Sequence, residues 1–572
     1  MRTIAVTRIR IITAVVIFIA ASLLVRLYQI QVLNGSEYAQ RAQKQYVHTA
    51  RDLYSRGNIY MTTRDGELVS AASMQAGYLL AVNPTLIGDV NAAYQLLQPY
   101  LSVDRDTFIS RASKPDRTYV EVEQMLTETA ADAIDELDID GILLYRNQWR
   151  YYPGEDLAAR TLGFVGFDDT VNERLVGKYG LERQYNDVLL RSDHTLSINF
   201  FAEIFSNLGN IVFDRTEVKE GDIVTSLEPT VSRMLDRILG ETQDEWHSKL
   251  TGGVIMNPQT GEIYAMNVIP TFNLNDRRGV DIDHFRNPLV EDVYEMGSII
   301  KALTMAAGLD ADAVTPMTTY YDAGFVELDT LTISNYDGRG RGTIPMQEVL
   351  NQSLNTGVTF VMQEMGKERF RDYFLALKLG SETGVDLPGE IYGLVNNLDS
   401  PRQVEYATAS FGQGIALTPI ATVRALSTLG NGGKLVTPHL ATKIVYQDGS
   451  EKPITYPEGK QVFKPETSEE ISRMLTTVVD DALQGGAVAL PNHTIAAKTG
   501  TAQIADHEGG GYYDDRYLHS FFGYFPAYDP KFIVFLYTVE PKEVRYASET
   551  LTDPFMELTA FLINYYNIPP DR

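Results

Sequence analysis

Two pairs of β-rich runs, near opposite ends of the C-terminal part of the chain, constrain its fold more than any other feature. The first pair, 253–256 and 263–268, flanks the turn signal Asn257-Pro258-Gln259-Thr260-Gly261, which is typical of a hairpin. The second pair, 521–525 and 532–539, is separated by a short Asp-Pro segment. The residues between the pairs have mostly helical patterns, and the chain closes on the spacing of a final helix. We therefore predict an α/β (α+β) domain in which helices flank a central antiparallel sheet built from both ends of the segment.

The upstream patterns indicate a separate domain. Residues 55–84 alternate like short strands joined by tight turns such as Asp65-Gly66, and residues 85–145 have a mainly helical pattern with acidic, solvated faces. A charged, Gly-containing stretch then marks a boundary. We expect one domain at 34–220 and another at 221–572.

The N-terminus predicts a membrane anchor. Three arginines precede an uncharged run of 15 residues at 11–25, and an apolar pattern continues past Arg26 to Leu33. The run alone is shorter than the roughly 20 residues that span a bilayer, but an arginine near a helix end can extend its charge to the interface. We expect a transmembrane helix at 11–33.

Basic residues in a short tail favour a cytoplasmic position, so residues 1–10 are predicted inside and the rest of the chain outside the cytoplasmic membrane. Two other interpretations stay open. The run also suits a signal peptide, with Ala20-Ala21-Ser22 as a cleavage site, and a buried soluble helix is the third reading.

Composition excludes several chemistries. The chain contains no cysteine, which excludes disulfides, thiolate metal sites and a cysteine nucleophile. Its formal net charge of −26 repels phosphate backbones, so no nucleic-acid partner is expected. The metalloprotease pattern His-Glu-x-x-His is absent, and we predict neither a metal nor a cofactor.

A serine and a lysine three residues apart form the first candidate site. Ser298 and Lys301 follow Gly297 at the expected start of a helix, where positions i and i+3 share a face. The surrounding residues are apolar, and burial would lower the pKa of the lysine and make it a base for the serine hydroxyl. A helix-capping serine beside an unrelated lysine is the alternative for this motif alone.

Two further motifs follow in the same predicted domain. Ser353-Leu354-Asn355 is weak by itself, since such residues often occur at turns or helix ends. Lys498-Thr499-Gly500-Thr501 follows a β-prone segment and would present a positive charge and hydroxyl groups to an anion. The ordered set S-x-x-K, S-x-N and K-T-G is the signature of penicillin-binding proteins and class A β-lactamases.

The sequence resembles the class B penicillin-binding proteins, membrane-anchored D,D-transpeptidases that cross-link peptidoglycan. The resemblance covers nearly the whole chain. It includes two motifs typical of the family's elongated pedestal (dimerisation-like) domain and three segments of its transpeptidase domain: Arg56-Gly57 with Arg64-Asp65-Gly66; Arg150-Tyr151-Tyr152-Pro153 with 162–166 and Gly180-Leu181-Glu182; 252–263; 411–415 with Thr418-Pro419; and Asn431-Gly432-Gly433. It implies an N-terminal transmembrane helix, a pedestal and a penicillin-binding/serine β-lactamase-like transpeptidase domain.

The resemblance also implies catalytic roles. Ser298 would attack the penultimate D-Ala carbonyl of a stem peptide, and Lys301 would accept its proton. Ser353 would relay a proton to the leaving D-Ala amine in the field of Lys301 and Lys498. Asn355 would bind a substrate amide and hold Lys301.

The strand motif is implied to bind the substrate. Lys498 and Thr499, with Gly500 and Thr501, would engage the terminal carboxylate, and the backbone N–H groups of Ser298 and Thr501 would form the oxyanion hole. A second stem peptide's amine would then release the enzyme. β-Lactams would be covalent inhibitors at the same serine.

A monofunctional enzyme of this family implies a SEDS-type glycosyltransferase partner and other division or elongation proteins. Whether the protein serves division or elongation stays open. The alternatives are a β-lactamase or β-lactam sensor, a bifunctional class A enzyme, and a catalytically silent scaffold. We find no base for a deacylating water and no glycosyltransferase residues, and an intact motif set argues against a silent scaffold.

Overall fold

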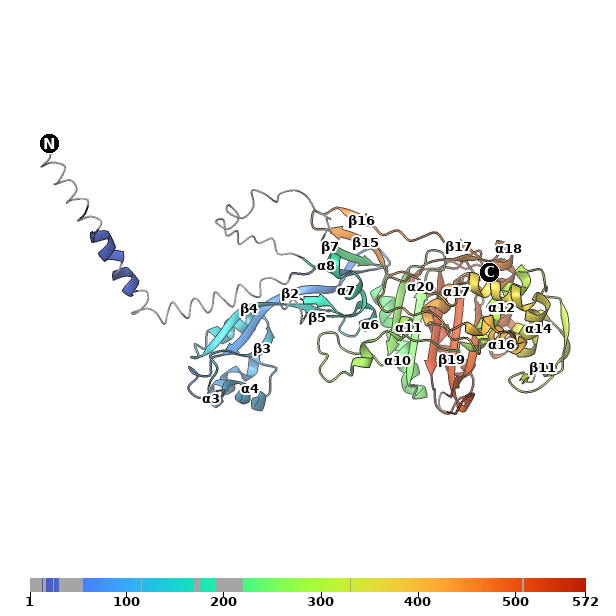
Figure 1. Cartoon of the computed structure of the whole chain (residues 1–572), viewed down its shortest axis with the longest axis horizontal. Helices are drawn as coiled ribbons and strands as arrows, with labels where there is room; N and C mark the ends of the chain where they lie inside the picture. Colours follow the sequence, from blue (N-terminus) through green and yellow to red (C-terminus); the bar gives the residue numbers. More distant parts are fainter. Residues whose placement is uncertain are drawn as a thin grey trace, which may run out of the picture. The chain divides into compact units, whose positions relative to one another are not determined.

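The computed structural model describes most of the chain as two compact units (Figure 1). The small unit is built on Met74–Arg150, and the large unit combines Arg56–Ser73, Tyr151–Leu190 and the chain from residue 220 onward. The residues described are 13, 17–23, 25–29, 55–114, 116–168, 175–191, 220–329, 331–506 and 509–572.

The predicted anchor at 11–33 lies partly outside the described residues. Among those that are described, no helix is long and apolar enough to cross a membrane.

A five-stranded antiparallel sheet forms the centre of the large unit. Its order joins late strands to early ones: β18 (Ala496–Ala505), β19 (Tyr512–Phe525), β20 (Phe532–Val539), β8 (Leu250–Met256) and β9 (Ile263–Ile269). The predicted sheet from both ends of the segment is confirmed. The junction is the β20–β8 pair, in which Phe535 lies opposite Val254.

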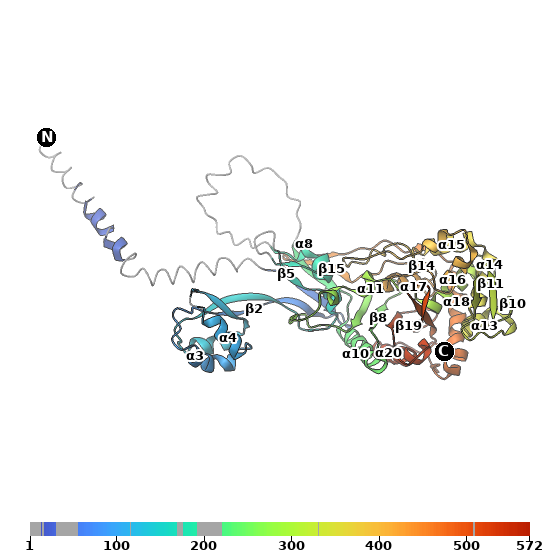
Figure 2. The same cartoon turned by 60° about the horizontal axis from the view of Figure 1, so that its bottom comes forward.

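The two faces of this sheet bury separate cores. Because successive strand residues point to opposite faces, the neighbours Phe521 and Phe522 enter different cores. On one face α10 (Pro229–Trp246) and α20 (Thr552–Tyr565) lie side by side (Figure 2). The closing helix predicted from the apolar spacing is α20.

The other face is covered by the helical region between β9 and β18, whose α12 is apolar and buried on nearly all sides. The helices of that region are α11 (Pro288–Glu291), α12 (Ile300–Asp310), α13 (Met346–Asn351), α14 (Asn355–Met365), α15 (Lys367–Ala376), α16 (Gln403–Ser410), α17 (Pro419–Ser427) and α18 (Pro465–Thr477).

Between α12 and α13 the chain leaves the helical layer as two nested hairpins, here called the 319–345 excursion. The outer pair is β10 (Thr319–Asp322) with β13 (Gly342–Pro345), and the inner pair is β11 (Phe325–Leu328) with β12 (Leu331–Ser334). The excursion returns the chain directly to α13 and to the second motif.

The small unit corrects the expectation that residues 85–145 are mainly helical. It contains three α-helices, α3 (Val90–Leu97), α4 (Arg105–Ala112) and α5 (Glu128–Asp135), but also β3 (Val120–Leu126) and β4 (Ile142–Tyr151). Both strands pair with β2 (Leu68–Val82). In β3 the acidic residues alternate with buried or half-buried apolar ones, which is a strand period rather than a helical face.

A second sheet of the large unit contains the first of the pedestal-like motifs. There β1 (Ile59–Thr62) pairs with the start of β2 around the turn at Asp65-Gly66, and with β7 (Gly221–Thr225), which pairs with β15 (Ala441–Tyr446).

A buried ion pair joins the two pedestal-like motifs within the large unit. The Nε of Arg56 donates to Glu182 Oε2 at 2.6 Å, and their side chains are 1% and 0% exposed. The second motif also contributes Tyr152, whose hydroxyl donates to Glu182 Oε1 at 3.3 Å. Satisfying each polar atom in this way is what makes a buried charge tolerable.

Candidate active site

Ser298 lies on a short 3-10 turn, η4 (Gly297–Ile299), that leads into α12. The turn packs tightly on β18, because a Cβ built on Gly297, whose φ is +64°, would come within 2.7 Å of Thr501 O. Glycine is therefore needed at this position, both for its backbone angle and for the close approach. The approach places the half-buried Ser298 beside the strand of the third motif.

Lys301 occupies the first turn of α12 and is 1% exposed. Its Nζ donates to the carbonyl oxygen of Ser353 and to Ser353 Oγ, the latter at 3.2 Å. It lines the same cavity as Ser298. The first two predicted motifs are thus brought together.

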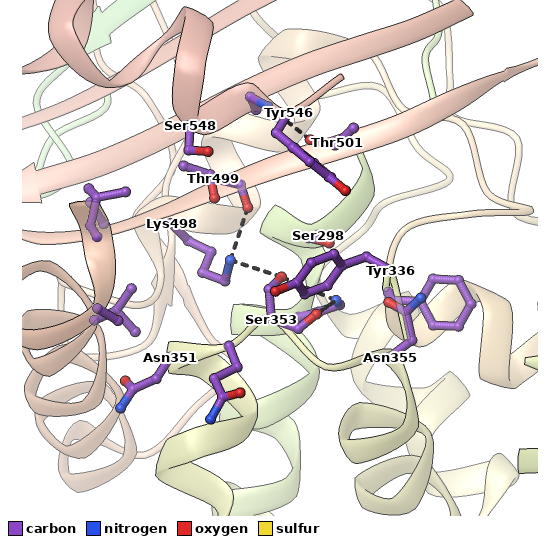
Figure 3. A pocket seen from close by; sticks show the side chains of 18 of the residues that line it. Ser298, Tyr336, Asn351, Ser353, Asn355, Lys498, Thr499, Thr501, Tyr546 and Ser548 are labelled. Carbon is purple, nitrogen blue, oxygen red and sulfur yellow. Dashed lines mark hydrogen bonds between the residues drawn. The ribbon is translucent and has the colours of Figure 1, made fainter. Parts of the chain in front are cut away.

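The third motif meets them at the same hydroxyl (Figure 3). Lys498 Nζ donates to Ser353 Oγ at 3.1 Å and to Thr499 O at 3.1 Å. Ser353 has a φ of +55°, in the left-handed region that residues other than glycine rarely adopt. Its hydroxyl consequently lies between two lysine amines, one from a helix and one from a strand.

Burial lowers the pKa of both amines, and the charge of Lys498 acts on Lys301 in addition. Burial lowers the pKa of Lys301 well below its usual range, and the charge of Lys498 lowers it further. Burial also lowers the pKa of Lys498 to about 8. A neutral amine at Lys301 can accept a proton, while Lys498 keeps its charge at neutral pH.

Some residues of the strand motif line the cavity, and Gly500 packs behind the cavity wall. Thr499 and Thr501 share a face of β18 and line the cavity, and Thr501 Oγ1 accepts from the N–H of Ala547 at 3.0 Å. Gly500, predicted to bind substrate, is not part of the cavity wall. A Cβ there would lie 2.4 Å from Ser520 Oγ on β19, 2.8 Å from Met296 O and 3.0 Å from Ile299 Cγ2, so Gly500 lets β18 approach η4.

Asn355 differs from the expectation that it holds Lys301. Both residues belong to the described part of the chain, and no hydrogen bond joins them. The Asn355 amide donates instead to Ser334 O, in the 319–345 excursion, at 2.9 Å. Ser353 takes over the contact with Lys301, while Asn355 still lines the cavity.

The cavity has a volume of about 490 Å³, and the sequence motifs account for only part of its wall. Tyr336 and Tyr546 come from separate loops, and their rings meet edge to face with centroids 5.9 Å apart. Arg545 and Ser548 also line it. These residues were missed because their segments, two loops and the short helix α19 (Ala547–Thr550), carry no motif of fixed spacing.

Glu295, three residues before Ser298, ties the serine turn to two other segments. Its Oε1 accepts from Gly414 N at 2.9 Å and from the hydroxyl of Tyr512 at 3.2 Å. Burial raises the pKa of this carboxyl. The E-x-x-S spacing was visible in the sequence, but the partners were not.

Within the described ranges, no three His, Asp or Glu side chains gather in a way that could hold a metal ion. The polar groups of the cavity are hydroxyls, amides and cationic side chains. With a serine beside a buried amine and hydroxyl donors for an anion, they define a site for serine acyl transfer.

Comparisons with known proteins agree with this class. The penicillin-binding protein transpeptidase domain family matches residues 251–558, and the penicillin-binding protein dimerisation domain family matches residues 53–197. The chain belongs to the penicillin-binding protein transpeptidase family.

Similar proteins span most of the chain. Stage V sporulation protein D of Bacillus subtilis is 31% identical over 75% of this chain and 66% of its own length. The probable peptidoglycan D,D-transpeptidase PenA of Neisseria meningitidis serogroup A is 26% identical over 96% of this chain and 91% of its own. The crystal structure of penicillin-binding protein 2X from Streptococcus thermophilus has the same fold, with a TM-score of 0.70 at 20% identity over 90% of this chain and 81% of that one.

Proposed function

We propose that this protein is a peptidoglycan D,D-transpeptidase that cross-links stem peptides through an acyl-enzyme on Ser298. The observation that carries the proposal is the Ser353 hydroxyl, held 3.2 Å from Lys301 Nζ and 3.1 Å from Lys498 Nζ in the cavity that Ser298 lines. A scaffold or a capping serine has no need for two buried amines around one hydroxyl.

Acylation begins when Ser298 Oγ attacks the carbonyl carbon of the penultimate D-Ala. Its proton passes to Lys301, which the lowered pKa keeps neutral. The negative oxygen of the tetrahedral intermediate accepts from the backbone N–H groups of Ser298 and Thr501. The C–N bond then breaks, and the leaving amine of the terminal D-Ala takes a proton through Ser353.

Deacylation transfers the acyl group to an amine. The amine of a second stem peptide attacks the ester carbon and loses a proton to the Lys301–Ser353 pair. The ester C–O bond breaks, and Lys301 returns the proton to the departing Ser298 Oγ. The new amide bond is the cross-link, and the enzyme returns to its starting state.

The terminal carboxylate of the donor is bound by the strand motif. Lys498 supplies a charge, and Thr499 and Thr501 supply hydroxyl donors on one face of β18. A β-lactam presents a similar carboxylate beside a strained amide, so it acylates Ser298 and blocks the enzyme. Penicillin-binding protein 3 of Mycobacterium tuberculosis, 22% identical, has been solved with aztreonam and with ampicillin.

We also propose that the protein is held in the cytoplasmic membrane by residues 11–33, with residues 1–10 inside and the catalytic domain outside. Helical residues of this segment expose large apolar side chains: Ile17, Phe18 and Leu23 are 63%, 72% and 65% exposed. Such exposure suits a lipid environment. A SEDS-type glycosyltransferase and other division or elongation proteins are the proposed partners.

The test measures what the enzyme does with a synthetic pentapeptide donor that ends in D-Ala-D-Ala. The full-length protein in detergent should release D-Ala and form a cross-linked product when an acceptor amine is added, and Ser298→Ala should do neither. Hydrolysis of the peptide without cross-linking would indicate a carboxypeptidase, and hydrolysis of penicillin without a stable adduct would indicate a β-lactamase. Acylation by penicillin without turnover of the peptide would indicate a sensor.

A further inference from the structure

We infer that Asp322 is a positioning residue: it holds the backbone turn at Ser353, through Asn335 and Thr356, so that the Ser353 hydroxyl stays between the two lysine amines. This inference rests on the proposed function. Asp322 does not line the cavity, and it acts on the reaction only through other residues.

Asp322 is a carboxylate enclosed by hydrogen-bond donors. It stands at the end of β10 and is 1% exposed. Its Oδ1 accepts from Gly324 N at 2.9 Å, and its Oδ2 accepts from Arg341 N at 3.1 Å. The amide nitrogen of Asn335 lies 3.0 Å from each of the two oxygens. Both oxygens are therefore committed to N–H donors.

From Asp322 the network reaches the start of α14. The hydroxyl of Thr356 lies 2.9 Å from Asp322 Oδ1 and 3.0 Å from Asn335 Oδ1. The backbone N–H of Thr356 donates to Asn335 Oδ1 at 3.2 Å. Asn335 and Thr356 are 4% and 5% exposed, so water cannot replace these contacts. The first turn of α14, which begins two residues after Ser353, is thus fixed to the excursion.

The same segment also holds the residue on the other side of Ser353. Arg341, whose backbone N–H donates to Asp322, donates from Nε to Gln352 Oε1 at 3.0 Å. Asn355 is tied to Ser334 O by its amide. Hydrogen bonds from the excursion therefore fix the chain immediately before and shortly after Ser353.

These hydrogen bonds matter because the backbone at Ser353 is strained. A φ of +55° at a serine persists only where surrounding contacts determine the backbone. Relaxation to a negative φ would swing the Ser353 side chain away from Lys301 and Lys498. The network supplies the constraint that keeps this conformation.

The competing explanation is that Asp322 only stabilises its hairpins. Asp386 provides a matched control in the same unit, because it is also buried, at 6% exposure, and also accepts several hydrogen bonds. Its donors are Leu440 N, Ala441 N and the hydroxyl of Tyr185, at 2.7–2.8 Å, and the hydroxyl of Tyr456 at 3.3 Å. It lies outside the cavity wall.

The experiment compares Asp322→Asn with Asp386→Asn in the full-length protein in detergent. Either orientation of the new amide turns an NH₂ group toward N–H donors, so Asp322→Asn should distort the turn. We expect acylation by a fluorescent penicillin and kcat for D-Ala release to fall at least about tenfold, with KM changed less than about threefold. Asp386→Asn should lower the melting temperature but leave acylation within about twofold of the wild type.

Thr356→Val and Thr356→Ser complete the test and cover the case in which Asp322→Asn does not fold. Valine removes the hydroxyl at nearly constant volume and should reproduce the loss of kcat, while serine should retain most of it. Wild-type acylation rates for Asp322→Asn or Thr356→Val, or equal losses in Asp386→Asn, would overturn the inference. Failure of the wild type to release D-Ala would instead refute the proposed function, because the ratio of penicillin acylation rates does not depend on turnover.

Discussion

The charge of Lys498 is predicted to control the protonation of Lys301, and Lys498→Met tests this coupling. Lys301 Nζ and Lys498 Nζ both lie within 3.2 Å of Ser353 Oγ, so the two nitrogens are at most about 6 Å apart. At that separation and an effective dielectric constant of about 20, two positive charges repel by about 3 kcal/mol. This corresponds to roughly a hundredfold change in the protonation equilibrium of Lys301.

Removing the charge of Lys498 should therefore raise the pKa of Lys301, although burial keeps that pKa below its ordinary value. Since the base must be neutral to accept a proton, the acid limb of the pH profile of the acylation rate should move to higher pH by about 2 units. The wild type should also lose activity above about pH 8, where Lys498 loses its proton, and the variant should lack this alkaline limb.

The assay is the second-order rate constant for acylation by a fluorescent penicillin between about pH 5 and pH 10. The variant is slower because it lacks a cation for the carboxylate of penicillin. The pH at which the acid limb falls does not depend on the maximal rate, so the two profiles can still be compared. Lys434→Met, at an exposed lysine outside the cavity, is the control and should leave the profile unchanged. An acid limb of Lys498→Met that stays in place, or moves to lower pH, would refute the coupling.

Three further substitutions test the packing around the site. Gly500→Ala should lower stability by about 1–3 kcal/mol and slow acylation, because its methyl group collides with Ser520 on β19 and with Met296 O and Ile299 at η4, which pushes β18 away from η4; wild-type melting and acylation would contradict this. Arg56→Met should cost about 3–5 kcal/mol in a denaturant titration by removing the buried cation that Glu182 faces, and adding Glu182→Leu should restore most of it; a neutral Arg56→Met would refute that account. Tyr336→Ala should raise KM for the stem peptide at an unchanged melting temperature, since this half-exposed ring forms cavity wall; an unchanged KM would exclude such a role.

The sequence predicted the central sheet and the meeting of the three motifs for physical reasons. Hairpin signals and β-rich runs are local, and closing the sheet from both ends followed from having two unpaired hairpins in one domain. The i and i+3 spacing predicted that Ser298 and Lys301 share a face, and both line the same cavity, Ser298 from η4 and Lys301 from the first turn of α12.

The contacts that the sequence did not predict are those set by tertiary packing. Nothing local at Asn355 indicates that its amide turns to Ser334, because this partner depends on how the 319–345 excursion folds back. The strand β3 was predicted to be helical because its acidic residues also suit the exposed face of a helix. Tyr151–Leu190 belongs to the large unit, where Glu182 pairs with Arg56, a residue 126 positions away that no local pattern connects to it.

The central claim, that Ser298 is the nucleophile, is tested most directly by mass spectrometry of the full-length protein after reaction with penicillin. The account predicts one adduct with the full mass of the β-lactam, on the proteolytic peptide that contains Ser298, and no adduct in Ser298→Ala. The absence of an adduct in the wild type, or an adduct on Ser353 or any other residue, would contradict it.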